Sequence, residues 1–317
     1  MSTTTLAPGR GQQDKRETKA KAKHSERARA ERRLGWMLAG PAFFTMLAVT
    51  AYPIIQATWD SLWSFRLTVP DEREFVGLGN YGVVLTDSVW WNSVAVTALI
   101  TVVTVAVELV LGFALALVMH KAIRTLRPLL RTAILIPYAI ITVVSAFAWQ
   151  FAFAIDSGFI NTWFGLEDTD WFGSFWSSIV VICLSEIWKT TPFMSLLLLA
   201  GLAQVPEDLQ EAAKVDGATW LQRLWKVTIP NMKAAIMVAL LFRTLDAFRI
   251  FDNVFIMTGG ANNTETVSFL AYRQTISRVE IGLGSSVSVL LFLCVVLIAF
   301  SFIKGFRVDL SQARGGQ

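Results

Sequence analysis

The stretch that decides the interpretation of this chain is EAAKVDGA at residues 211–218, followed by VTIP at residues 227–230. It is polar and lies between two long apolar segments. Pro206 stands before it, followed by Glu207 and Asp208. Proline is accepted in a first helical turn, and acidic side chains there interact favourably with the helix dipole, so a short helix is predicted to begin at this proline.

Three further residues predict that this helix turns into a second one. Gly217 predicts the end of the first helix, because glycine readily adopts the left-handed conformation of a helix end. Thr219 and Gln222 have the spacing of a capping box, which predicts a second helix that begins at Thr219. From these residues alone, the simplest interpretation is an interfacial hairpin whose tryptophans, Trp220 and Trp225, lie among lipid headgroups.

The composition excludes an ordinary soluble domain. Of the 317 residues, 54% are hydrophobic and 16% are charged, and the mean hydropathy is +0.52. An apolar run of about 20 residues spans the hydrocarbon core as a helix, and such runs are too long for barrel strands. The predicted fold is therefore an all-α polytopic membrane protein with six transmembrane helices. The six runs are residues 35–63, 93–119, 131–155, 175–201, 233–258 and 283–304.

The charges predict how these helices cross the membrane. With the N-terminus inside, the inner segments carry 21 Lys or Arg residues and the outer segments carry four. Because inner segments are enriched in Lys and Arg, both termini and the 205–230 loop are predicted to lie in the cytoplasm of a cell-membrane protein. The predicted domains are a basic tail at 1–33, a membrane domain at 34–304 and a short tail at 305–317.

The basic tail holds ten Lys or Arg residues against four acidic residues. It contains no aromatic residue that could stack on bases, so no nucleic-acid partner is predicted. A solvated, disordered segment or a short surface helix near anionic lipid is the expected form, with membrane lipid as its partner.

The spacing in the polar stretch resembles the EAA loop by which membrane subunits of ABC importers dock onto their ATPases. The family pattern is EAA, three residues, Gly, nine residues, Ile, one residue and Leu-Pro; here Val227 replaces the Ile and Ile229 the Leu. The resemblance covers about residues 35–304. It is to the maltose-type permeases of binding-protein-dependent sugar importers, and within them to the trehalose importers of actinobacteria. Other resembling segments are FVGLGNY at 75–81, IWKTTPF at 187–193, FDN at 251–253 and TGG at 258–260.

This resemblance implies a type I ABC importer permease that performs no bond chemistry and needs no cofactor or metal. The implied partners are a second homologous permease, a dimer of ABC ATPases, an extracellular sugar-binding protein and an oligosaccharide. ATP hydrolysis would belong to the ATPases, because this sequence contains no phosphate-binding loop. The residues implied to couple to the ATPase are Glu211, Ala212, Ala213, Asp216, Gly217 and Ala218.

Charged residues within the apolar runs require a structural or functional explanation. Inserting one such residue at mid-membrane costs about 2.5–3.5 kcal/mol on insertion scales. Glu186 and Lys189 are three residues apart and are expected to pair on one helix face. Residues 243–252 carry a ladder of alternating charge along one expected helix, which indicates a surface lined by water or protein. Salt bridges that fix helix packing are the alternative explanation, mainly for its end members. The ladder consists of Arg243, Asp246, Arg249 and Asp252.

Maltose-type permeases have sugar-contacting side chains at positions that match several of these residues. The resemblance implies substrate binding by Asp246 and Arg249, and by Trp188, Thr190 and Phe193. Charged groups suit sugar hydroxyls, and an aromatic face suits the apolar face of a sugar ring. Core packing remains the alternative for the two aromatic residues.

A membrane-embedded transferase is the alternative from another class. It would use the carboxylates of Glu186, Asp246 and Asp252 for acid–base or metal chemistry, but the loops lack acidic motifs with metal-ligand spacing. A scaffold or sensor is a third alternative, and costly charges inside the membrane argue against it. Two more polar residues of the apolar runs, Glu108 and Gln150, are given no role beyond lining or packing.

Overall fold

The computed structural model describes residues 10–69, 71–121, 127–166 and 168–305, and the ends of both predicted tails, 1–9 and 306–317, lie outside them. The chain divides into two compact units after Gln56. The first unit is formed by most of helix α1 (Arg10–Asp60), which contains Pro41 and Pro53. The backbone of residues 10–33 is helical and continuous with the apolar run that follows.

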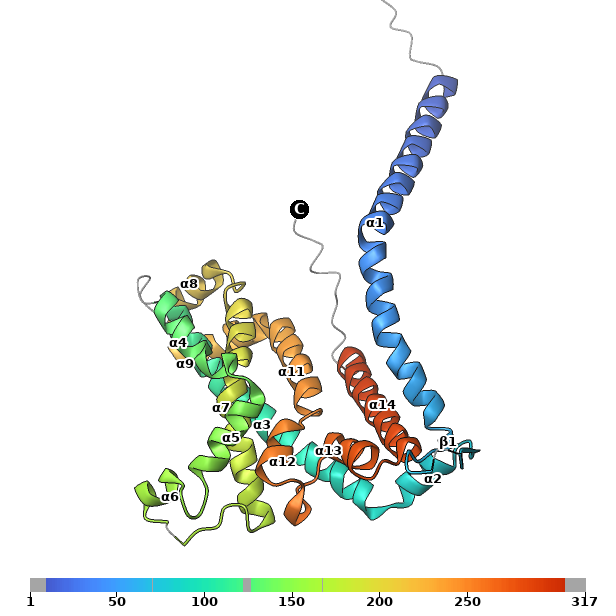
Figure 1. The fold of residues 1–317 in the computed structure, drawn as a ribbon. Coiled ribbons are helices and arrows are strands. Elements are labelled where there is room, and N and C mark those ends of the chain that lie inside the picture. The colour runs from blue at the N-terminus through green and yellow to red at the C-terminus, as the bar shows by residue number, and fades with distance from the viewer. Residues whose placement is uncertain (1–9, 70, 122–126, 167, 306–317) are drawn as a thin grey trace, which may run out of the picture. The chain divides into compact units, whose positions relative to one another are not determined.

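The second unit begins with a small sheet and continues as helices (Figure 1). Strand β1 (Trp63–Ser64) pairs antiparallel with β2 (Glu74–Phe75), with Trp63 opposite Phe75. The helices are α2 (Gly79–Thr86), α3 (Ser88–Lys121), α4 (Arg127–Ala139), α5 (Thr142–Ala152), α6 (Phe159–Phe164), α7 (Phe175–Leu202), α8 (Glu207–Val215), α9 (Trp220–Arg223), η1 (Leu224–Thr228), α10 (Ile229–Asn231), α11 (Lys233–Ala247), α12 (Asp252–Met257), η2 (Ala261–Asn263), α13 (Val267–Tyr272), η3 (Arg273–Ser277) and α14 (Ile281–Gly305).

Four helices of the described residues are long and apolar enough to cross a membrane: residues 33–60 of α1, α3, α7 and α14. They match four of the six apolar runs. A fifth run, 131–155, forms α4 and α5, which are bent by 83° at a short break. Counted as one span, this pair gives five candidates.

The sixth run, 233–258, differs from the single helix expected for it. Helix α11 ends at Ala247, and α12 begins only at Asp252. Phe251 between them has φ −136° and ψ −60°, outside the helical region. The backbone therefore leaves the helical path at the polar positions of the expected ladder.

Helix α7 organises the second unit, because it packs against α3, α4, α5, α11 and α12. Figure 1 shows α8 and α9 at one end of α7 and α6 at the other. Gly112 lets α3 and α7 approach closely: a Cβ atom there would lie 2.8 Å from Met194 Cγ and 3.2 Å from the backbone nitrogen of Ser195. This closely packed pair of long helices carries several of the polar residues of the site described below.

Candidate functional site

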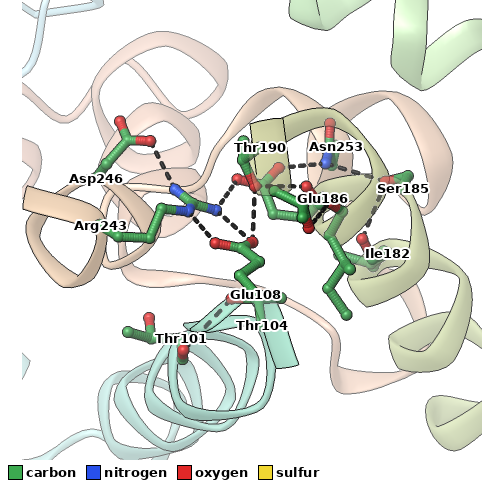
Figure 2. A network of polar contacts seen from close by, with 12 residues as sticks. Thr101, Thr104, Glu108, Ile182, Ser185, Glu186, Thr190, Arg243, Asp246 and Asn253 are labelled. Carbon is green, nitrogen blue, oxygen red and sulfur yellow. Dashed lines mark hydrogen bonds and ion pairs between the residues drawn. The ribbon is translucent and has the colours of Figure 1, made fainter. Parts of the chain in front are cut away.

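A buried guanidinium joins three helices inside the second unit (Figure 2). Arg243 of α11 is fully buried and donates through Nε and Nη2 to the carboxylate of Glu108 on α3, with the Nη2–Oε1 distance 3.0 Å. Its Nη2 also lies 2.7 Å from Glu186 Oε1 on α7, and its Nη1 lies 2.6 Å from Asp246 Oδ2. The one cation therefore faces three carboxylates.

Neutral polar groups complete this network and extend it to a fourth helix. The Thr190 hydroxyl donates to Glu108 Oε1 at 2.7 Å. Asn253 of α12 donates from Nδ2 to Glu186 Oε2 at 2.9 Å and to Ser185 Oγ at 3.1 Å. Buried charges are tolerated when they are paired and hydrogen-bonded, which is the condition met here. We call Glu108, Glu186, Thr190, Arg243, Asp246 and Asn253 the polar network.

A cavity of about 440 Å³ lies against this network. It opens between α4, α5, α7 and the break that separates α11 from α12. Asp246 connects the two features, because its carboxylate binds the buried Arg243 while 61% of its side chain is exposed. The lining residues are Tyr138, Thr142, Glu186, Lys189, Thr190, Asp246, Arg249, Ile250, Phe251, Asp252 and Asn253.

The expected ion pair between Glu186 and Lys189 is not formed. Arg243 and Asn253 each bind one oxygen of Glu186, so the carboxylate is already satisfied. The Lys189 ammonium lies 5.5 Å from the centre of the Tyr138 ring, and it makes no ion pair with a residue that the structure describes. Both residues line the cavity, as neighbours on one helix face do.

The expected ladder of residues 243–252 is also different in the structure. Only its first pair forms: Arg243 binds Asp246 three residues on. Arg249 lies beyond the end of α11, where its Nε donates to the Leu245 carbonyl at 3.2 Å, and Asp252 begins α12. Because the helix is broken, the last two charges reach the cavity from irregular backbone and a helix start, not from one continuous face.

The structure brings together three of the five expected substrate-binding residues: Thr190, Asp246 and Arg249 line the cavity. Phe193 is not in the lining, but its ring stacks on Tyr138 with centroids 5.4 Å apart. Trp188 lies outside the lining; 41% of it is exposed, and its ring centroid is 6.0 Å from that of Trp149.

Sequence reasoning gave no role to several residues that the structure places at the site. Glu108 was noted only as a polar residue of an apolar run, and Asn253 only as part of a resembling segment. One signal for Glu108 was available: it has no charged neighbour in its own apolar run. A charged residue inside the membrane needs a partner, so the partner of Glu108 had to come from another helix. Tyr138 and Thr142 carried no signal. Gln150 lies outside the network and donates to the Ile256 carbonyl at 2.8 Å.

The predicted helix–turn–helix of residues 206–230 is confirmed. Helix α8 follows Pro206, and Gly217 after it has φ +80°. The predicted capping box is present in both directions: Thr219 N donates to Gln222 Oε1 at 2.8 Å, and Gln222 N donates to Thr219 Oγ1 at 3.4 Å. Gln210 of α8 donates to Thr228 Oγ1 at 2.8 Å, which ties the two arms together. We call residues 206–230 the hairpin.

The hairpin presents apolar side chains to its surroundings. No residue of α8 is buried. Val215 is 88% exposed and Trp225 is 63% exposed, and Leu209 and Leu221 are also exposed. Exposed apolar side chains on such an element can contact a partner protein or the lipid interface.

The chain is similar to known transport proteins over most of its length. A family model described as the inner membrane component of binding-protein-dependent transport systems matches residues 108–307. The chain is 52% identical to the trehalose transport system permease protein SugA of Mycobacterium tuberculosis, over 91% of this chain and 92% of that protein. It is 36% identical to the trehalose/maltose transport system permease protein MalF of Thermococcus litoralis, over 88% and 96%.

A solved structure has the same fold. A chain of a bacterial ABC transporter involved in the import of the acidic polysaccharide alginate superposes with a TM-score of 0.75, over 90% of this chain and 99% of that chain. The sequences are 18% identical, so this likeness concerns the fold.

Proposed function

Because the chain belongs to the family of inner membrane components of binding-protein-dependent transport systems, we propose that it is the permease subunit of an ATP-driven importer of a neutral disaccharide. The family and the long apolar helices make it a multi-pass membrane protein of the ABC importer type I permease fold, and a transport component, not an enzyme. The sugars for which these relatives are named, trehalose and maltose, are the first candidates for the cargo.

The observation that carries this proposal is the cavity beside the broken helix. Its volume of about 440 Å³ falls within the roughly 300–1,000 Å³ of small-molecule sites. Carboxylates, cations and hydroxyls line it, and these groups can bind the many hydroxyls of a sugar. Transporter substrates commonly bind near the midplane where a helix is interrupted, as α11 and α12 are here.

The charge of the lining favours a neutral sugar over an acidic one. Glu186, Asp246 and Asp252 contribute three carboxylates, against the two cations Lys189 and Arg249. Arg243 and Glu108 behind the lining compensate each other. The excess of negative charge would therefore repel an anionic sugar. Such repulsion of the wrong ligand is one way in which a site discriminates between substrates.

The hairpin is the proposed coupling element. Its exposed surface would fit a groove of an ABC ATPase, with Glu211 bound by a basic residue of that subunit and Ala212, Ala213, Asp216 and Ala218 in the same contact. Gly217 permits the sharp turn between its arms. Closure of an ATPase dimer would then move the hairpin as a rigid lever, and the helices would rock between inward- and outward-open states.

The other parts of the proposal are a second homologous permease and an extracellular sugar-binding protein. Two permeases would enclose the translocation path, and the binding protein would deliver the sugar from outside. Both termini and the hairpin would lie in the cytoplasm, as the distribution of Lys and Arg predicts.

The test is reconstitution with the neighbouring permease, the ATPase and the binding protein in proteoliposomes. We expect ATP hydrolysis to rise when binding protein loaded with trehalose or maltose is added, and sugar to accumulate in the lumen. Glu211→Ala should abolish both responses, whereas Gln204→Ala, an exposed position just before the hairpin, should retain them. A chain that recruits no ATPase contradicts the proposal.

The alternative of a membrane-embedded transferase is not supported by the site. Both oxygens of Glu186 accept hydrogen bonds, from Arg243 and Asn253, so this carboxylate is held in place and its charge is compensated. Asp246 is likewise bound to Arg243. Two of the three carboxylates on which that alternative depends are therefore engaged in ion pairs with Arg243.

A further inference from the structure

A second cavity, of about 350 Å³, lies between the ends of α3 and α7 and the hairpin. It is separate from the cavity beside the polar network, and none of the six proposed coupling residues lines it. Its lining residues are Leu117, His120, Lys121, Leu202, Ala203, Val205, Glu207, Gln210, Trp220, Arg223, Leu224 and Thr228. The functions proposed above therefore assign no ligand to this cavity, although hairpin residues form part of its lining.

Two cations line this cavity without a carboxylate to bind them. Lys121 and Arg223 form no ion pair with any residue that the structure describes, although Glu207 is in the same lining. The Lys121 ammonium lies 4.9 Å from the centre of the Trp220 ring, so its aromatic contact leaves the positive charge uncompensated. Glu207 lies in the first turn of α8, where the helix dipole stabilises its charge. The lining thus lacks one negative charge.

The position of the cavity indicates which kind of ligand could supply the missing negative charge. Lys121 is the last residue of α3, and Leu202 is the last residue of α7, and both helices are long and apolar enough to span a membrane. Both helices exceed the about 20 residues needed to span the hydrocarbon core, so their ends, where the cavity lies, would reach the headgroup region. Trp220, 48% exposed, is a residue type enriched at this interface. Basic pockets between helix ends are typical sites for anionic headgroups.

We propose that this cavity binds a phosphate group, presented by the headgroup of an anionic phospholipid or by a soluble phosphate anion. The planar guanidinium of Arg223 suits two phosphate oxygens, and the Lys121 ammonium adds a point charge. Because the two cations belong to the hairpin and to α3, one bound phosphate connects these elements. An anion held there fastens the hairpin to the membrane helices.

The test is native mass spectrometry of the purified full-length chain in detergent, titrated with phosphatidylglycerol, with phosphatidylcholine and with inorganic phosphate. We expect phosphatidylglycerol to bind more tightly than phosphatidylcholine. The double variant Lys121→Gln/Arg223→Gln should weaken the binding of phosphatidylglycerol by about tenfold or more, since it removes charge-assisted hydrogen bonds. The matched control, Lys226→Gln/Lys233→Gln, removes the same charge from exposed positions outside the lining and should bind as the wild type does.

The inorganic phosphate arm distinguishes the two sources of the phosphate. If phosphate binds and displaces phosphatidylglycerol, the site takes soluble anions; if only phosphatidylglycerol binds, it is a lipid site. Equal binding of both lipids together with no binding of phosphate would overturn the proposal. If the double variant and the control lose the same amount of affinity for phosphatidylglycerol, the proposal is also overturned, because the effect would then come from general surface charge.

A measurement on the wild type alone covers the case in which the double variant does not fold. Hydrogen exchange of the amides in residues 207–228 is compared between nanodiscs of phosphatidylcholine and nanodiscs that also contain phosphatidylglycerol. Slower exchange with phosphatidylglycerol, in these residues and not in α14, supports the site. Identical exchange in the two membranes, with phosphate added or not, overturns it.

Discussion

The guanidinium of Arg243 binds the carboxylate of Glu108 through two of its nitrogens, although the two residues are 135 positions apart in the sequence. Both side chains are fully buried, and the pair joins α11 to α3. Glu186 and Asp246 bind the same guanidinium from two other directions. A single arginine therefore joins α3 to α7 and α11, and the last two helices contribute to the cavity lining.

Removing this arginine should unfold the site. Arg243→Met leaves the carboxylates of Glu108 and Glu186 buried without their cation, and breaking a buried pair in this way costs about 3–5 kcal/mol. We expect a large loss of folded protein, measured as a lowered melting temperature in detergent. Arg249→Met is the matched control: this arginine forms no ion pair with a described residue and should change the melting temperature little.

The double variant Glu108→Gln/Arg243→Met tests whether the cost comes from unpaired charge. It removes the cation and one of the anions together, so it should be more stable than Arg243→Met alone. An equal or greater loss of stability would contradict the assigned pairing.

Asp246 should act on the substrate more than on stability. Its side chain is 61% exposed, and asparagine keeps an oxygen that can accept from Arg243. The charge of Arg243 is still compensated by Glu108 and Glu186. We expect Asp246→Asn to raise the KM for sugar uptake by about tenfold, the cost of one hydrogen bond to a charged group, with the melting temperature nearly unchanged. Transport kinetics and thermal unfolding of the same preparation separate the two effects. A lower melting temperature with an unchanged KM would show that Asp246 only fixes helix packing.

Gly217 should be needed for the conformation of the hairpin. Its φ of +80° lies in the left-handed region, where a residue with a Cβ atom costs about 1–2 kcal/mol. We expect Gly217→Ala to speed hydrogen exchange in residues 207–228 and to lower sugar uptake per ATP hydrolysed. Gly82→Ala is the control, because Gly82 is helical and a Cβ atom there meets nothing within 4 Å. Normal coupling in Gly217→Ala would contradict a rigid hairpin.

The capping box should behave as one unit. Thr219→Ala and Gln222→Ala each remove half of a reciprocal pair of hydrogen bonds, and losing a cap costs about 1 kcal/mol. Hydrogen exchange at the start of α9 should become faster in each variant. The double variant should be less affected than the sum of the single variants, because the two bonds support each other. Strictly additive effects would argue that the bonds act independently.

The close approach of α3 and α7 should be sensitive to volume at Gly112. A Cβ atom there would lie 2.8 Å from Met194 Cγ, and overpacking a core typically costs about 1–3 kcal/mol. We expect Gly112→Ala to lower the melting temperature. Adding Met194→Ala should recover part of the lost stability, since it removes the side chain that the new Cβ atom would overlap. Gly305→Ala, which meets nothing within 4 Å, serves as the control.

The hairpin could be predicted in detail because its signals are local. A proline, a glycine and a Thr–Gln pair each act on backbone a few residues away, so their spacing in the sequence is also their spacing in space. The helix starts, the turn at Gly217 and the capping box were all predicted, and the structure has them. The helices α3, α7 and α14 could be predicted for a similar reason, because an apolar run long enough to cross a bilayer can be recognised within one continuous stretch of sequence.

The partners of the buried charges were decided by the tertiary structure. The sequence alone determined that residues such as Glu186 and Lys189 need partners inside the membrane. The only partner that helical spacing indicated for each of them was the other, three positions away. In the fold, Arg243 reaches Glu186 from another helix, and Lys189 lies over Tyr138. Helical spacing fixes only which residues of one helix are neighbours. The contacts between helices, and the break at residues 248–251 that brings Arg249 and Asp252 to the cavity, depend on the packing of the whole second unit.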